Sequence, residues 1–302
     1  MKMFRTHSAA LSVGARCASS SAVTRTKRTV RIGGASGFWG DSAIAAPQLL
    51  AAGTQLDYLV FDYLAETTLA IMARMKEKRP DAGYATDFVD ITMKQIAPTL
   101  KKSGVKVISN AGGINPLACK TALEKTLRAV GVDLKVGVVL GDDLLDRSAV
   151  LRDTGVAEMF SGERMPDGIK SSNAYLGARP IAALLAEGCD VVITGRCVDS
   201  AVTLGACIHE FGWADDQYDA LAGGTIAGHI IECGAGSGIR IAHVVRDPNH
   251  ARGAGSVPRL WMKEPGGILG AHGDPAPDAT CAFQARRPLV GCSPIGRNVT
   301  AG

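Results

Sequence analysis

The sequence predicts an α/β protein built on a mainly parallel sheet, with helices on both faces in Rossmann-like layers. From Thr29 to about Gly195, short β-branched runs alternate with segments of helical periodicity, and parallel strands require crossover helices of this kind between them. The composition agrees with that class. Apolar residues make up 46% of the chain and aromatic residues only 5%, and plentiful Gly and Ala favour close packing of helices on a sheet.

Five strands and seven helices are expected along the chain. Apolar, β-branched runs predict strands at 29–32, 58–61, 105–109, 135–140 and 190–194. Helical spacing predicts helices at 43–52, 67–78, 88–102, 116–130, 180–187, 198–211 and 221–232. Asn115 and Pro116 suit a helix start, whereas Gly104 and Gly131 lie where helices are expected to end.

Residues 1–28 are expected to be a mitochondrial transit peptide. The first 31 residues carry seven Lys and Arg residues and no acid, because the first acidic residue of the chain is Asp41. An acid-free start rich in Arg and Ser is typical of a transit peptide and predicts the mitochondrial matrix as the location. A disordered basic leader is the alternative interpretation.

The charge and hydropathy of the rest of the chain limit the kinds of partner that we expect. The overall charge of +4 less the seven leader charges leaves −3, which argues against a nucleic-acid partner. No run of 18 uncharged apolar residues occurs, so we expect no membrane span. We expect a small-molecule substrate and a homo-oligomer.

The α/β domain is expected to cover residues 29–235. From Gly236 to Gly302 the periodicity fades while Pro, Gly and Arg crowd together. This composition predicts an irregular, atypical C-terminal tail.

Polar residues and glycines follow every predicted strand. The carboxyl ends of parallel strands meet at one edge of a sheet, where ligands bind, so we expect these loops to form one site. The catalytic candidates are Ser36, Asn110, Asp143 and Asp199, with Asp143 or Asp199 as the general base. The candidate substrate-binding residues are Gly34, Gly37, Trp39, Gly40, Asp41, Asp62, Asn173 and Arg196, with Arg196 as the anchor for a substrate anion.

The stretch "GGASGFWGDS" at 33–42 allows a nucleotide interpretation. Gly34, Gly37 and Gly40 have the spacing of a dinucleotide loop, and Asp62 ends the second strand where a ribose hydroxyl could be held. Short-chain dehydrogenases have a similar loop, but no tyrosine of this chain is followed four residues later by the lysine that they require. A nicotinamide-dependent oxidoreductase therefore stays the weaker alternative.

Two metal sites are conceivable from spacing alone. His229, Glu232 and Cys233 share a helical face, but buried polar residues beside a buried thiol are the simpler interpretation. Asp142 and Asp143 could hold Mg²⁺ or could cap the next helix. We therefore assign no metal ligands and leave the cofactor open.

Several strings together resemble the acyclic terpene utilisation (AtuA-type) family, in its N-terminal domain, from about Val30 to Ala235. They are "RIGGASGFWGDS", "LDYLVFDYLAE", "VKVISNAGGINP", "SSNAYLGARPI", "DVVITGRCVDSA" and "FGWADDQYDALAGGTIAGHIIECGA". After "ECGA", Gly236-Ser-Gly-Ile replaces the Gln and Thr-Gly-Gly continuation of relatives.

The resemblance implies a part in the catabolism of acyclic terpenoids through branched acyl-CoA thioesters. We expect an enzyme of unassigned reaction, of hydrolase or lyase type, with an acyl-CoA or a related anionic substrate. The phosphates of coenzyme A are candidates for the glycine loop, since backbone N–H groups at a helix start bind anions. A non-catalytic partner of a biotin-dependent acyl-CoA carboxylase is the second alternative.

Overall fold

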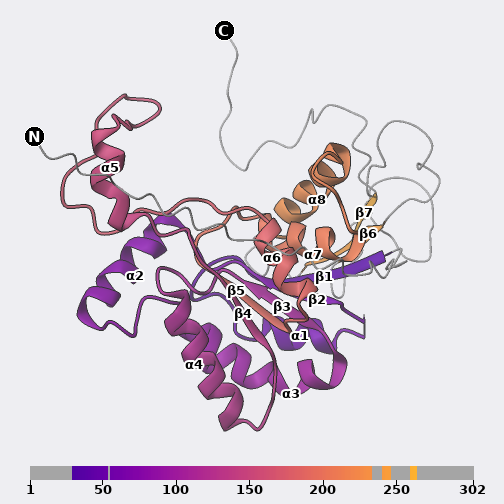
Figure 1. Ribbon diagram of the computed structural model, residues 1–302. Helices are drawn as coiled ribbons and strands as arrows, with labels where there is room; N and C mark the ends of the chain where they lie inside the picture. The colour runs from indigo at the N-terminus through magenta and orange to yellow at the C-terminus, as the bar shows by residue number, and fades with distance from the viewer. Residues whose placement is uncertain (1–28, 54, 233–239, 246–258, 264–302) are drawn as a thin grey trace, which may run out of the picture.

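The computed structural model describes residues 29–53, 55–232, 240–245 and 259–263. Its seven-stranded sheet has the order β4-β5-β3-β2-β1-β6-β7, and neighbours from β4 to β1 all run parallel (Figure 1). The strands are β1 (Thr29–Ser36), β2 (Tyr58–Phe61), β3 (Lys106–Ser109), β4 (Val136–Val139), β5 (Val191–Thr194), β6 (Arg240–Val245) and β7 (Arg259–Lys263).

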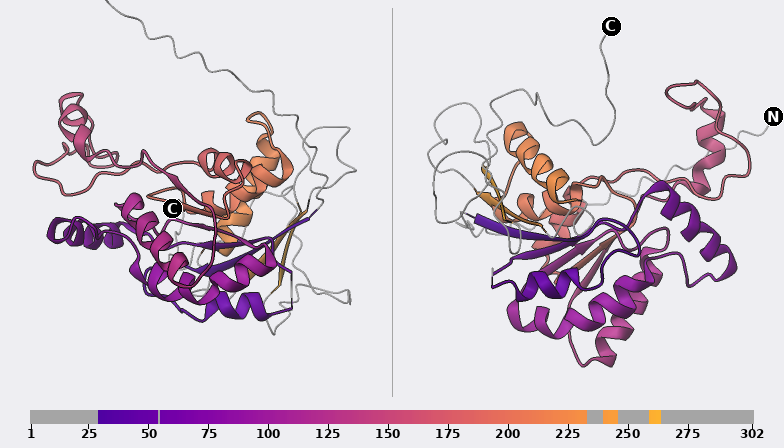
Figure 2. Two further views of the ribbon diagram at one scale, coloured as in Figure 1. Left: turned by 60° about the horizontal axis from the view of Figure 1, so that its bottom comes forward. Right: turned by 180° about the vertical axis from the view of Figure 1, so that it is seen from behind.

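Helices cover both faces of this sheet, which confirms the predicted α/β class (Figure 2). They are α1 (Ala45–Ala51), α2 (Glu66–Lys78), α3 (Lys94–Ser103), α4 (Pro116–Ala129), α5 (Ser148–Asp153), α6 (Arg179–Ala186), α7 (Ala201–Phe211) and α8 (Tyr218–Ile231). A π-helical segment, Phe88–Met93, leads directly into α3, and a 3₁₀ turn, Leu145–Arg147, leads into α5.

Alternate strand residues divide the core between the two faces of the sheet. Leu59 and Phe61 of β2 pack with the helices α1, α3 and α4, whereas Tyr58 and Val60 pack with α6, α7 and α8. This follows from the two-residue period of a strand, and all four side chains are buried. Because both faces are covered, a ligand can reach the sheet at the ends of the strands and their loops.

The structure differs from the sequence prediction most clearly in β1, in α5 and in the tail. β1 runs on to Ser36 instead of ending at residue 32, because its glycines stay extended and pair with β2 across a bulge. α5 and the 3₁₀ turn before it were not expected. The expectation of an irregular tail is wrong for β6 and β7, since β6 pairs antiparallel with β1 and β7 with β6.

Other expectations fall outside the described residues. They concern the leader at 1–28, and the tail at 236–239, 246–258 and 264–302. Within the described ranges, no helix is both long enough and apolar enough to span a membrane.

Gly112 gives the first testable prediction. A Cβ atom there would lie 2.6 Å from the carbonyl oxygen of Thr194 and 2.9 Å from Cα of Pro116. Both are backbone atoms, so Gly112→Ala must displace the join between β5 and the start of α4, and we expect it to lower the free energy of unfolding by about 2 kcal/mol.

Urea unfolding with Gly177→Ala as the control measures this effect. A Cβ atom at Gly177 would meet nothing within 4 Å, so that variant should stay within about 0.5 kcal/mol of the wild type. Equal stability of the two variants would contradict the packing described.

Candidate functional site

Hydrogen bonds join the loops that follow β2 and β3. Asn110 Nδ2 donates to Asp62 Oδ1 over 2.5 Å, and Asn110 Oδ1 accepts from the backbone N–H of Tyr63 over 2.7 Å. The N–H of Leu64 also donates to Asp62 Oδ1, over 3.1 Å. Both Asp62 and Asn110 are buried. Asn110 therefore fixes the position of Asp62.

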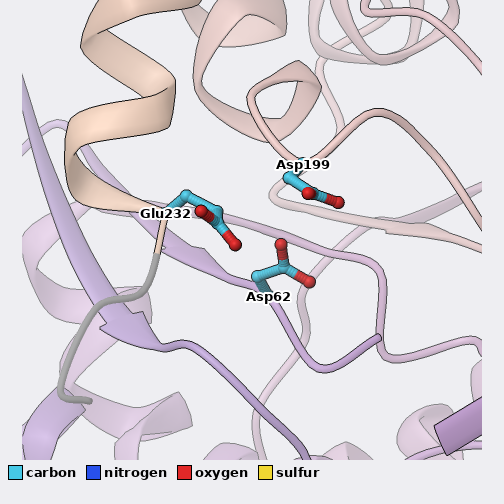
Figure 3. A group of neighbouring side chains, drawn as sticks. All are labelled: Asp62, Asp199 and Glu232. Atoms are coloured by element: carbon cyan, nitrogen blue, oxygen red, sulfur yellow. The ribbon is translucent and has the colours of Figure 1, made fainter. Parts of the chain in front are cut away.

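Asp62 faces two further acids, and Figure 3 shows the three carboxyl groups pointing toward one another. Asp199 precedes α7, and Glu232 follows the last residue of α8. One carboxylate oxygen of each residue lies within 4.8 Å of the others. We call Asp62, Asp199 and Glu232 the carboxylate cluster.

Asp62 is the buried member of this cluster, and only 3% of it is exposed. Its Oδ2 atom has no hydrogen-bond partner among the described residues. Burial raises the pKa of Asp62 from 3.8 to about 7, and the charges of Asp199 and Glu232 add to the rise. The bonds from Asn110 and Leu64 lower the pKa but do not outweigh burial.

Arg196 lies beside the cluster with only 4% of its side chain exposed. Its Nη1 donates to Asp199 Oδ1 over 2.8 Å, and its Nη2 donates to the Tyr175 hydroxyl over 3.0 Å and contacts Glu66 at 3.4 Å. The guanidinium also stacks 4.1 Å from the centre of the Tyr175 ring. A substrate anion would have to displace these groups, so this geometry makes Arg196 the residue that positions Asp199 and does not support the expected anion anchor.

Asp142 forms hydrogen bonds with residues next to the carboxylate cluster. Its Oδ2 accepts from the backbone N–H of Arg196 over 2.8 Å and from Asn173 Nδ2 over 2.9 Å, and burial raises its pKa. Its carboxylate lies against the backbone of Gly195, where any Cβ atom would overlap it. Asn173 therefore belongs to the site through Asp142.

The glycine loop does not have the geometry of a nucleotide site. α1 begins at Ala45, five residues beyond Gly40. The N–H of Gly37 donates to Asp41 over 3.0 Å and that of Gly40 to Asp87 over 3.2 Å. These acids occupy the positions that a phosphate would need, and Asp62 is too buried to face a ribose.

The remaining candidates lie around this centre. Ser36 is buried, with its Oγ 3.1 Å from the carbonyl oxygen of Phe38 and 3.3 Å from that of Asp62. Gly34 lies within β1 beside Val60, and Trp39 packs against the core, half-buried. Asp143 is exposed and accepts the N–H of Leu145 over 2.9 Å. Ser36 therefore contacts backbone acceptors, and Asp143 is bound in a turn outside the carboxylate cluster.

An open hollow of 420 Å³ lies next to Asn173. It separates α2 from the segment after β4, which Figure 1 shows standing away from the sheet with α5. The hollow is large enough for part of a small ligand. Its polar lining includes Lys76, Glu77, Asp143, Lys170 and Asn173.

Sequence spacing did not reveal the role of Glu232. It had suggested Glu232 only beside His229 and Cys233. In the structure His229 is exposed and outside the cluster, and Cys233 lies outside the described residues. Glu232 instead meets Asp62 and Asp199, which are 170 and 33 positions away in the chain. A pattern of local spacing cannot show such a contact.

Fold and site together define an α/β protein with a carboxylate cluster, one member of which is buried, beside the carboxyl ends of parallel strands. The chain belongs to the family described as "Acyclic terpene utilisation family protein AtuA", whose model matches residues 30–243. This confirms the resemblance and connects the chain with acyclic terpene utilisation. No curated protein and no solved structure gives a significant match.

Asp62 yields a prediction on the pH dependence of stability. Its pKa is higher in the folded chain, about 7, than its ordinary value of 3.8, so the folded state holds the proton more tightly. The free energy of unfolding should therefore fall as the pH rises from about 4 to 7, by up to about 4 kcal/mol. Asp62→Asn removes this fall and should be more stable than the wild type at pH 8.

Urea unfolding at pH 5 and pH 8, with EDTA present, measures the difference. The new amide oxygen can still accept from Asn110, so the local hydrogen bond survives. Asp133→Asn, at an exposed position, should keep the pH dependence of the wild type. A variant at position 62 that remains as pH-sensitive as the wild type would rule out this account of Asp62.

Proposed function

We propose that the chain is an enzyme of acyclic terpenoid breakdown that acts on an acyl-CoA thioester or a related anionic acyl compound. Family membership supports the metabolic context. The reaction centre is assigned to the carboxylate cluster, and the reaction class is hydrolytic or lyase. The observation that carries this proposal is the unpartnered Oδ2 atom of buried Asp62.

The free-energy cost of that arrangement supports a catalytic role. Taking a carboxylate out of water costs several kcal/mol unless it is paired. Arg196 pairs with Asp199 and contacts Glu66, while Asp62 receives only neutral donors. Polar groups that are buried at such a cost, at the edge where α/β proteins bind ligands, are typical of active sites.

The hollow beside Asn173 supports an anionic substrate. Lys76 and Lys170 both line it. Lys170 forms an exposed ion pair with Glu77 over 2.6 Å, and an exposed pair contributes little to stability. The lysine can therefore turn to a substrate phosphate or carboxylate at small cost. The chain of contacts Asn173–Asp142–Arg196 joins this hollow to the carboxylate cluster.

Thermal denaturation of the full chain with candidate ligands tests the proposal. Branched acyl-CoA thioesters should raise the melting temperature by about 3 °C or more near ten times Kd, and mass spectrometry should detect their conversion. Lys170→Ala should reduce the shift. Lys120→Ala is the matched control, because Lys120 also pairs with a glutamate, Glu124, but lies outside the hollow.

Other outcomes would favour the alternatives. A shift with NAD(P)H and none with acyl-CoA would replace the proposal with an oxidoreductase. Co-purification with a biotinylated carboxylase subunit, without turnover of any acyl-CoA, would replace it with a non-catalytic partner. Equal shifts for the two lysine variants would remove the hollow from the substrate site.

A further inference from the structure

The carboxylate cluster has the composition of a cation site. Its ligand atoms are all carboxylate oxygens, and they come from three separate parts of the fold: the end of β2, the start of α7 and the end of α8. Carboxylate oxygens are the preferred ligands of hard divalent cations. A group of acids alone would not define such a site, since acids also gather on solvated surfaces.

The second observation is the orientation of Asp62. Its Oδ1 atom is tied to Asn110 and Leu64, which leaves the side chain no freedom to turn away. Its Oδ2 atom is buried and lacks a hydrogen-bond partner among the described residues, and its carboxyl group faces Asp199 and Glu232 (Figure 3). A buried polar atom without a partner is rare in folded proteins and calls for a specific explanation.

The partners of Asp62 also favour a cation. Arg196 bonds to Asp199 and contacts Glu66, whereas the hydrogen bonds that Asp62 receives from Asn110 and Leu64 come from neutral groups. A small cation placed between the three cluster oxygens would neutralise the charge of Asp62 over the shortest distances.

We propose that Asp62, Asp199 and Glu232 bind one hard divalent cation of the Mg²⁺ or Mn²⁺ type. The cluster oxygens lie within 4.8 Å of one another. Ligand oxygens on opposite sides of Mg²⁺ lie about 4.2 Å apart, given Mg–O distances near 2.1 Å, so a small inward movement of the side chains brings the three oxygens to ligand distance. Asp199 and Glu232 are only partly buried, so water or a substrate oxygen can complete the coordination shell.

This inference deepens the proposed function and rests on the same site. A cation held there would polarise the carbonyl oxygen of a bound acyl group, or would lower the pKa of a bound water. The cation still has its own readout, because binding can be measured without any substrate.

Binding of Mn²⁺ to the full chain, after removal of metals with EDTA, tests the inference. Electron paramagnetic resonance of free Mn²⁺ should show about one ion bound per chain, displaced by Mg²⁺. Asp62→Asn and Glu232→Gln should each weaken binding by at least about tenfold. Glu124→Gln, at a partly buried acid whose only ion pair among the described residues is with Lys120, should bind like the wild type.

The melting temperature of each variant in EDTA separates the loss of a ligand from misfolding. Loss of Mn²⁺ by a variant that melts at or above the wild-type temperature identifies a ligand. Absence of binding at millimolar Mn²⁺, or equal affinity in all four proteins, would overturn the inference.

The two proposals fail in different ways. If Mn²⁺ binds but no acyl-CoA shifts the melting temperature, the cation site stands and the substrate proposal is wrong. If acyl-CoA shifts the melting temperature equally with EDTA and with Mg²⁺, and Mn²⁺ does not bind, the substrate proposal stands and the cation site is wrong.

Discussion

The buried guanidinium of Arg196 is the interaction on which the rest of the site depends. Its side chain contacts three loops: the one after β2 through Leu64 and Glu66, the one before α6 through Tyr175, and the one before α7 through Asp199. Its bonds to Tyr175 and Asp199 raise its pKa although burial opposes this. The charge is therefore permanent, and it sets where Asp199 lies relative to Asp62.

The glycine loop has the spacing of a nucleotide-binding loop but forms different contacts. In a dinucleotide protein the glycine N–H groups bind a pyrophosphate at the start of a helix. Here the carboxylates of Asp41 and Asp87 accept from those groups and so take the place of a phosphate. The loop becomes a rigid corner between β1 and α1, beside Ser36 and the backbone of Asp62. Its contribution is to hold the end of β2 in place.

The sequence was informative where structure depends on local pattern. The strand at 58–61 was placed to the residue, and the helices on both faces followed from the 3.6-residue spacing of apolar side chains. The gathering of Asp62, Asn110, Arg196 and Asp199 followed from one topological rule, that parallel strands end at the same edge. These are constraints that a few neighbouring residues impose.

What the sequence left open depends on distant contacts. Neither the meeting of Glu232 with Asp62 nor the pairing of β6 with β1 is encoded in any short window. Arg196 was expected to anchor a substrate anion, and its bonds to Tyr175, Asp199 and Glu66 could not be foreseen, because an arginine in a loop shows its charge but not its partners. The extended glycines of β1 were likewise ambiguous, since pairing on both sides, and not propensity, keeps them in the sheet.

The close approach of Asp142 to Gly195 links two positions that lie 53 residues apart. The Asp142 carboxylate fits there only because residue 195 has no side chain. This close approach allows the carboxylate to accept a hydrogen bond from the N–H of Arg196. Neither residue can be replaced by a larger one without a change in the other. Among related chains, positions 142 and 195 should therefore vary together or not at all, and such covariation would be evidence of this packing.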